Sequence, residues 1–308
     1  MNNQDKKLLE FFDRQKTRIS NYLSVFFKKY TKAVFYKLAI AVVFMSLAIA
    51  SYAIYDGLIK SPKDMTTEEL SKQDESNCSV LGINLHGTLL TYMPPKNEND
   101  SFADTDVVAS EEIDYLIRQA SEDEQIKAII IEVDSQGGLP VAGEEIAEAL
   151  KQAGKPTVAV IRQSGLSAAY WAISSAGRIF ASKNSDVGSI GVTLSYLENV
   201  GKNKKNGTDY VQLIAGKYKD AGNPDKPLTE EERQLFMRDI NIIHQNFIAD
   251  VAANRDIPVA DVSKIADGSS VLGEQAKTLK LIDEIGGLSE AKIYLESKIG
   301  EKPEICWQ

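Results

Sequence analysis

The sequence predicts a layered α/β domain built on parallel strands and preceded by a single N-terminal transmembrane helix. Three observations lead to this fold class. Lys127–Val133 is centred on a continuous apolar run of strand length, which is typical of a strand buried on both faces. Pro156–Ile161 is a second short apolar strand, and Val141–Ala153 between the two has helical spacing. The third observation is an uncharged stretch of 18 residues, Leu38–Tyr55.

The alternation of strand, helix and strand implies parallel strands joined by right-handed helical crossovers. An earlier strand is expected at Ser79–Thr91, followed by a loop at Met93–Asp106 that is rich in Pro, Asn and Asp. With 308 residues, 43% of them hydrophobic, the chain can bury a large core in one or two domains.

The uncharged stretch is long enough, at about 1.5 Å per residue, to reach roughly across the hydrocarbon core of a bilayer. Residues 1–37 carry nine Lys/Arg against three acidic residues, so the positive-inside rule places the N-terminus in the cytoplasm. We therefore expect a basic amphipathic tail at 1–37, an anchor at 38–59, a stalk at 60–78 and an exported domain at 79–308. The expected location is the cytoplasmic membrane, with the large domain outside it.

Two alternatives concern this N-terminal region. Ala48-Ile49-Ala50 fits the small-residue pattern of a signal peptidase site, but the 37 residues before the apolar run are far longer than an ordinary signal-peptide n-region. An uncleaved anchor is therefore the preferred interpretation. The tail itself fits either a helix lying on an anionic membrane face or a solvated juxtamembrane segment. The rest of the chain carries 26 basic and 41 acidic residues, a balance that argues against a nucleic-acid partner.

The two cysteines, Cys78 and Cys306, lie near the two ends of the expected exported domain. In an oxidising compartment they could close a loop of more than 200 residues. The sequence alone leaves three arrangements open: an intramolecular bridge, two free thiols, or a bond between subunits.

A capping box at Thr229–Glu232 predicts the start of a long helix. Apolar residues then recur with helical spacing: Leu235, Phe236, Ile240, Ile243, Phe247, Ile248 and Val251. This stripe could be a subunit interface or part of the intrachain core, and we favour the core.

The segment Gln163–Trp171 predicts a strand-to-helix turn that presents Ser167 at a helix N-terminus. A serine at such a position is often only an N-cap, and it becomes a candidate nucleophile when a base is near. Because the chain has only two histidines, His86 and His244, a lysine is the more plausible base.

A lysine base needs a pKa near about 7 or 8, well below the usual value of about 10.4. The loop Ala215–Pro224 contains Lys217 and Lys219 between glycines. These two residues would share a face of an extended segment, so the residues alone do not choose between them.

Acyl transfer also needs donors where the oxyanion develops. Asp134-Ser135-Gln136-Gly137-Gly138 follows the buried strand and precedes a helix. Gly137 and Gly138 expose backbone N–H groups without side chains and are candidate oxyanion donors, although two glycines after a strand often form only a tight turn.

Taken together, these segments resemble the signal peptide peptidase (protease IV) family of membrane-anchored bacterial serine peptidases over about residues 79–300. The resemblance rests on the following ordered elements: Asp134–Gly138, the Ser167 turn, Val187–Val192, the Lys219 loop, and Asp267-Gly268 through Gly273–Ala276 to Leu281–Gly286. Two positions depart from the family pattern: Gln136 stands where proline is usual, and Ala168-Ala169 stands where glycines are usual.

The resemblance implies that Ser167 is the nucleophile, Lys219 the general base, Ser189 a hydroxyl that orients the lysine amine, and Gly137 an oxyanion donor. It also implies a crotonase-like and Clp-protease-like fold of stacked ββα units, no cofactor, and assembly into a ring-shaped homo-oligomer. In that family form, both members of the dyad come from one subunit, and the substrate cavity is built between subunits.

The sequence therefore predicts a membrane-anchored endopeptidase that uses a Ser-Lys dyad on short hydrophobic peptides, such as released signal peptides. Two alternatives remain at this point. One is a catalytically silent membrane scaffold with the same fold, and the other is a crotonase-type acyl-CoA enzyme.

Overall fold

The computed structural model describes residues 13–25, 28, 45, 78–93 and 106–308. The chain divides into two compact units, Met1–Ser71 and Lys72–Gln308. In the first unit, residues 13–25 are helical. The predicted anchor and stalk lie outside the described residues except for Met45 and Cys78, so these domain boundaries stay predictions. Across the described ranges, no helix has the length and apolar character that a membrane span requires.

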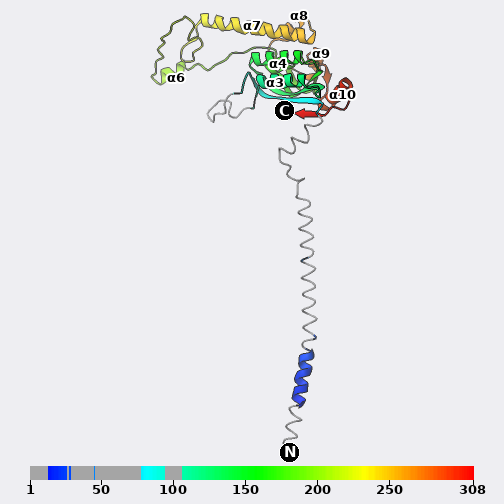
Figure 1. Ribbon diagram of the computed structural model, residues 1–308. Helices are drawn as coiled ribbons and strands as arrows, with labels where there is room; N and C mark the ends of the chain where they lie inside the picture. The colour runs from blue at the N-terminus through cyan, green and yellow to red at the C-terminus, as the bar shows by residue number, and fades with distance from the viewer. Residues whose placement is uncertain (1–12, 26–27, 29–44, 46–77, 94–105) are drawn as a thin grey trace, which may run out of the picture. The chain divides into compact units, whose positions relative to one another are not determined.

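The second unit is an α/β domain built on one largely parallel sheet, as predicted (Figure 1). Its central strands run in the order β2-β1-β3-β4-β5-β8, and among the strands that the structure describes only the pair β6 and β7 is antiparallel. The strands are β1 (Val80–Leu90), β2 (Val107–Ala109), β3 (Ala128–Gly138), β4 (Thr157–Leu166), β5 (Arg178–Ala181), β6 (Asp186–Gly188), β7 (Ser270–Leu272), β8 (Glu284–Ile285) and β9 (Ile305–Trp307).

Helices cover both faces of this sheet. The helices of this unit are α3 (Ser110–Glu122), α4 (Pro140–Gln152), α5 (Ala168–Ile173), α6 (Val200–Lys205), α7 (Glu230–Arg255), α8 (Val259–Ile265), α9 (Gly273–Thr278) and α10 (Leu288–Ile299). Ile129 and Ile131 of β3 belong to the larger core cluster, with α3, α4 and α5, whereas Ile130 faces the smaller cluster with α10. This alternation explains why the strand is a continuous apolar run, because both of its faces are buried.

Two strands extend farther than the sequence predicts. The segment Asp134–Gly138, which is predicted to follow the strand, is instead the C-terminal end of β3, and β4 continues to Leu166 instead of ending at Ile161. A register shift between Val133 and Ser135 accommodates the extension, and Ser135 pairs with Gly165 of β4. Gln136 donates a hydrogen bond to Ser164 Oγ at 2.9 Å, which joins the same two strand ends.

Helix α7 begins at the predicted capping box, in which Thr229 and Glu232 exchange hydrogen bonds. The predicted apolar stripe of α7 divides into two parts. Phe247, Ile248 and Val251 are buried in the core, whereas Leu235 and Phe236 are only partly buried. The core interpretation is therefore right for the C-terminal half of the helix.

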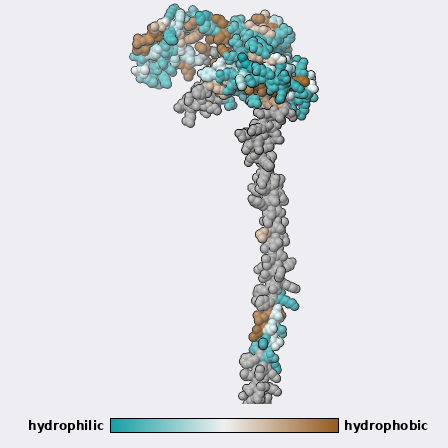
Figure 2. Space-filling view, viewed as in Figure 1, coloured by the Kyte–Doolittle hydropathy of each residue, from teal (hydrophilic) through white to brown (hydrophobic). Residues whose placement is uncertain are grey.

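Residues 192–229, which we call the arm, join the sheet to α7 and contain α6. Figure 1 shows the arm near the N-terminal end of α7, away from the strands, while the other end of α7 lies near α8. Many of its large apolar side chains are exposed: Leu194, Tyr196, Leu197, Tyr210, Val211, Leu213, Ile214 and Tyr218. Leu213 is 92% exposed and Leu197 is 88% exposed, and Figure 2 shows hydrophobic residues gathered on this part of the surface.

Cys78 and Cys306 form an intramolecular disulfide across 228 residues of sequence. The bridge connects Cys78, which lies just before β1, with Cys306 in β9, and β1 and β9 pair in parallel. Of the three arrangements that the sequence leaves open, the structure selects the intramolecular bond.

Candidate active site

Ser167 occupies the sharp turn between β4 and α5. Its backbone has φ 52° and ψ −128°, which is an uncommon conformation for a residue other than glycine. The Ser167 N–H donates to Gly188 O at 2.8 Å, and its carbonyl accepts from Trp171 N at 2.9 Å. Strained residues of this kind concentrate at functional sites, and here the backbone on both sides of the residue is held by hydrogen bonds.

Gly137, one of the two predicted oxyanion donors, lies directly beside Ser167. Its φ is +105°, and a Cβ at this position would lie 2.9 Å from Leu166 O and 3.0 Å from Ala168 N. The N–H of Gly137 donates to Ser135 Oγ at 3.1 Å. Gly138 lines the pocket next to Ser167. Of the two glycines, Gly138 is therefore the one that faces the space where a substrate would bind.

Ala168 adds a donor that the sequence interpretation did not include. It is the first residue of α5, and the first amides of a helix have no acceptor within the helix. Ala168 lines the same pocket as Ser167 and Gly138. The residue that follows a nucleophile commonly supplies an oxyanion N–H, so its backbone amide is a further candidate donor.

A pocket with a volume of about 440 Å³ opens beside Ser167. Its wall includes Trp171 of α5, which stacks on Phe247 of α7 with ring centroids 4.5 Å apart. The indole N–H of Trp171 donates to Asp250 Oδ2 at 2.9 Å. These contacts fix the buried end of α7 against the helix that carries the nucleophile turn.

His244 of α7 also lines this pocket, although the sequence interpretation gave it no role. Within the described part of the chain, its Nε2 is buried and has no hydrogen-bond partner. The spacing between His244 and Phe247 is the only sequence signal that could have placed it on the buried face of α7.

Ser189 also lines this pocket and, like Ser167, has a positive φ. Its φ is 50°, and it directly follows Gly188, which pairs with Leu166 in the parallel β4–β6 register. The predicted partner of Ser189 is the lysine amine. In the structure its hydroxyl instead donates to Gly268 O at 2.9 Å.

Lys219 lies on the arm and is not among the residues that line the Ser167 pocket. Its side chain is exposed, and in the described ranges no ion pair or side-chain hydrogen bond involves it. A single chain therefore brings together Ser167, Ser189, Gly137 and Gly138, and leaves Lys219 separate from them.

Lys217 differs from Lys219 in having a carboxylate partner. Its Nζ lies 2.7 Å from Glu231 Oε2, and this contact, together with Tyr218, raises the pKa of Lys217. A raised pKa is the opposite of what a general base needs, so the electrostatics argue against Lys217. Among the residues that the structure describes, no group of His, Cys, Asp and Glu side chains has the arrangement of a metal site.

Comparison with known proteins places these features in a family. Residues 149–300, which include Ser167 and Lys219, match the sequence profile described as peptidase family S49. A protein named as a protease from Methanocaldococcus jannaschii is 36% identical over 193 residues, which are 62% of each chain. A protein of Enterococcus faecium named as the signal peptide peptidase SppA is 26% identical over 228 residues, or 73% of this chain and 65% of that protein. The chain thus spans somewhat less than two thirds of these relatives.

Among solved structures, the chain is similar to a ClpP1 mutant from Listeria monocytogenes. The TM-score is 0.44 at 14% sequence identity, with 71% of this chain and 96% of that chain covered. The α/β class and the parallel sheet follow from the strand register of the chain itself. The finer likeness to Clp and crotonase units stays a prediction.

Proposed function

Because the chain belongs to peptidase family S49, a family of serine peptidases, we propose that it is a membrane-anchored endopeptidase that hydrolyses short hydrophobic peptides, such as released signal peptides. Ser167 is the nucleophile and Lys219 is the general base. The observation that carries this proposal is the conformation of Ser167. This residue lies in a strained turn, lines a pocket, and is next to Gly137, which has no side chain.

The proposed reaction is acyl transfer. Neutral Lys219 Nζ takes the proton from Ser167 Oγ as that oxygen attacks the scissile carbonyl carbon. The N–H groups of Gly138 and Ala168 stabilise the resulting oxyanion, with Gly137 keeping the space beside Ser167 free of a side chain. The lysine then donates the proton to the leaving amine, and water hydrolyses the acyl-enzyme by the same route.

Lys219 must reach Ser167 for this reaction, and a second copy of the chain offers a direct way. The arm that carries Lys219 exposes several apolar side chains, which is typical of a protein interface. The proposed homo-oligomer, a closed ring, would bury this surface and bring the arm of one subunit to the Ser167 pocket of its neighbour. This arrangement differs from the expected one, in which both members of the dyad come from one subunit. The reason is that the arm places Lys219 away from the Ser167 pocket of its own chain.

The mixing of two inactive variants tests this arrangement. Ser167→Ala and Lys219→Ala should each be inactive, and subunit exchange between them should restore part of the activity if the dyad is shared between subunits. If both residues act within one chain, mixed oligomers stay inactive. In that case the arm must fold back on its own domain.

The pocket supports the proposed class of substrate. Trp171, Phe247 and Val192 supply apolar surface next to the nucleophile, which suits hydrophobic side chains. The positive residues before the uncharged stretch support a single-pass topology in the bacterial cytoplasmic membrane, with the N-terminus in the cytoplasm. External protease added to spheroplasts should then digest residues after about 60 and spare the tail. Protection of the large domain would reverse this topology.

Covalent labelling with a fluorophosphonate probe tests the nucleophile directly. The full-length protein in detergent should be labelled on Ser167, and the label should disappear in Ser167→Ala. Ser189→Ala is the matched control, because Ser189 also has a positive φ and lines the same pocket. A label that persists in Ser167→Ala would refute the assignment.

The two alternative functions make different predictions. A silent scaffold would show no peptide turnover that depends on Ser167. An acyl-CoA enzyme would hydrolyse a thioester of coenzyme A faster than a peptide, and membership of a peptidase family argues against it. A comparison of both substrates with the same preparation separates the three cases.

A further inference from the structure

Lys219 lies in a short loop whose other charged side chains all have polar partners. Lys217 pairs with Glu231, and Lys226 pairs with Glu232 at the start of α7. Asp225 Oδ1 accepts a hydrogen bond from Asn203 Nδ2 at 2.8 Å. Among the charged residues at 215–226 in the described structure, Lys219 alone has no counter-ion or side-chain hydrogen bond.

Asp220, which follows Lys219 in sequence, is the nearest residue that could act as a counter-ion for the Lys219 amine. Adjacent Cα atoms are about 3.8 Å apart, so an unrestrained aspartate carboxylate could reach the amine of the long neighbouring lysine. Such a pair would favour the charged amine and raise the pKa of the lysine. A lysine that holds its proton cannot accept one from Ser167.

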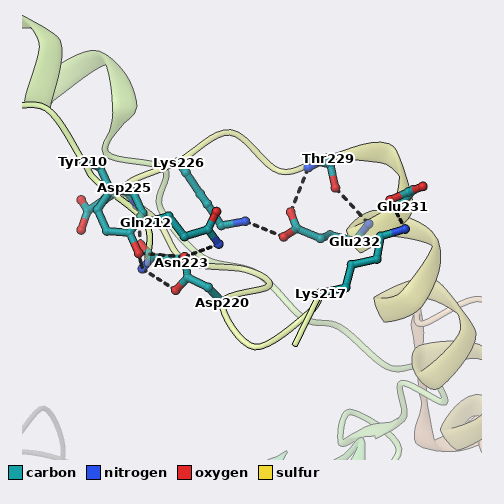
Figure 3. Close-up of polar contacts among 10 residues, drawn as sticks. All are labelled: Tyr210, Gln212, Lys217, Asp220, Asn223, Asp225, Lys226, Thr229, Glu231 and Glu232. Atoms are coloured by element: carbon teal, nitrogen blue, oxygen red, sulfur yellow. Dashed lines mark hydrogen bonds and ion pairs between the residues drawn. The ribbon is translucent and has the colours of Figure 1, made fainter. Parts of the chain in front are cut away.

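The structure shows where the Asp220 carboxylate is held instead. Asp220 Oδ2 accepts hydrogen bonds from Tyr210 OH at 2.7 Å and from Gln212 Nε2 at 3.1 Å. Asp220 Oδ1 accepts from Asn223 Nδ2 at 2.9 Å. Asn223 Nδ2 also donates to Tyr210 OH at 2.9 Å, which closes the network. Figure 3 shows these side chains gathered around the carboxylate, on the opposite side of the loop from the Lys217–Glu231 pair.

We propose that Asp220 is a positioning residue whose carboxylate is withheld from Lys219 by Tyr210, Gln212 and Asn223, so that the amine next to it stays without a counter-ion. This inference rests on the proposed role of Lys219 as the general base. The hydrogen bonds from Asn223 and Tyr210 lower the pKa of the Asp220 carboxyl, so the group is ionised across the working pH range and needs to be restrained.

The network has a second effect on the same loop. Tyr210 and Gln212 belong to the segment before the loop, whereas Glu231 and Glu232 belong to α7 after it. Hydrogen bonds from both directions therefore brace the loop that carries Lys219.

The titratable groups on these neighbouring elements are Asp209, Tyr210, Asp225, Lys226, Glu230, Glu231 and Glu232. Glu230, Glu231 and Glu232 already contact Arg233, Lys217 and Lys226, respectively. Asp225 accepts a hydrogen bond from Asn203, which leaves Asp209 as the acid to control for.

The test is the pH dependence of kcat/KM, measured on the full-length protein in detergent with a quenched fluorogenic peptide rich in leucine. Tyr210→Phe/Gln212→Ala/Asn223→Ala, the release variant, removes all three side-chain donors that hold the two carboxylate oxygens of Asp220. We expect the ascending limb of the profile to move to higher pH by about one unit, because the released carboxylate pairs with Lys219. Adding Asp220→Asn to the same variant should return the limb to the wild-type position or below it.

Two controls match this variant. Tyr196→Phe makes the same change at a tyrosine of the arm with nearly the same exposure, 39% against 40% for Tyr210, and should leave the limb in place. Asp209→Asn should not reverse the shift when it is added to the release variant. Partial misfolding would lower the plateau of the profile without moving the limb, so loss of folded protein cannot imitate the expected result.

Two outcomes would overturn the inference. The limb could stay in place while only the plateau falls, which would mean that the network merely braces the loop. Alternatively, the shift could persist after Asp220→Asn is added, which would mean that another group causes it. Lys219→Ala is measured first in the same assay. If that variant keeps wild-type activity, the proposed base itself is wrong, and this result is distinct from an unshifted limb in an enzyme that depends on Lys219.

Discussion

Gly137 and Ser167 approach so closely that a Cβ on Gly137 would lie 2.7 Å from the Cβ of Ser167. Gly137 lies at the end of β3, and Ser167 directly follows the neighbouring strand β4. The two strand ends are adjacent because Ser135 of β3 pairs with Gly165 of β4. The absence of a side chain at 137 is therefore a condition for the nucleophile to occupy its turn. This relationship leads to the first prediction.

Gly137→Ala should reduce kcat/KM by at least about 100-fold, the range expected when an oxyanion arrangement is disrupted. The added methyl group collides with Ser167, and alanine is strained at φ +105°. Gly154→Ala is the matched control, because Gly154 also has a positive φ, +65°, but no atom within 4 Å of the added carbon. The control should lose some stability and keep its activity. Equal activity in both variants would contradict the proposed geometry.

Lys219→Ala should abolish peptide hydrolysis, whereas Lys217→Ala should keep most of it. Lys217 is engaged by Glu231 in an exposed ion pair, and such pairs contribute little to stability. Steady-state rates of both variants, with circular dichroism as a check on folding, decide which of the two lysines is the general base. Loss of activity in Lys217→Ala alone would reverse the assignment.

The Lys226–Glu232 pair should make the base of the arm sensitive to acid. The hydrogen bond from Lys226, followed by that from the Thr229 backbone, lowers the pKa of Glu232 below its ordinary value of 4.5. The folded state therefore holds the ionised form more strongly than the unfolded state does. The resulting stability is complete above pH 4.5 and is lost as the pH falls through the lower folded-state pKa. Hydrogen exchange at residues 215–232, corrected for the intrinsic effect of pH, should report this loss.

Glu232→Gln should remove that pH dependence and speed exchange at neutral pH by roughly 100-fold, because it breaks a buried pair worth about 3 kcal/mol. The side chains of Lys226 and Glu232 are only 15% and 7% exposed. Glu231→Gln provides the exposed counterpart and should change exchange little. Similar effects of the two variants would show that burial does not strengthen the first pair.

Removal of the disulfide should lower the free energy of unfolding without a direct effect on the active site. Cys78→Ser/Cys306→Ser is expected to lose about 2–5 kcal/mol, since the bridge closes a very long loop. Thermal unfolding of the variant and of reduced wild-type protein should agree. If a reductant leaves the unfolding temperature of the wild type unchanged, the bridge does not contribute in solution.

The sequence predicts the parts of the fold that local signals determine. The apolar run of β3, the spacing of α4 and the capping box of α7 each depend on neighbouring residues, and each is found within a few positions of its expected place. The extension of β3 through Asp134–Gly138 was missed because it depends on pairing with β4 and β1, which the local pattern does not contain.

The candidate site shows the same limit. Ser167 and Gly137 are recognisable because a serine turn and paired glycines leave local patterns. The pocket wall from α7, with His244 and Phe247, comes from residues far along the chain and has no signal except helical spacing. The separation of Lys219 from Ser167 also escapes sequence reasoning, since it depends on the direction in which the arm leaves the domain.

The pairing of β9 with β1 has a consequence for how copies of this chain can associate. Strand β9 pairs with Val80–Gly82, and β2 pairs with Thr88–Leu90, so two short segments cover both ends of one strand that would otherwise offer unpaired amides and carbonyls. Between them, the Asn84 side chain donates to Gln308 O. An open sheet margin is a template for strand addition and aggregation, and this one is largely closed. Self-association of the domain by strand addition is therefore disfavoured along β1.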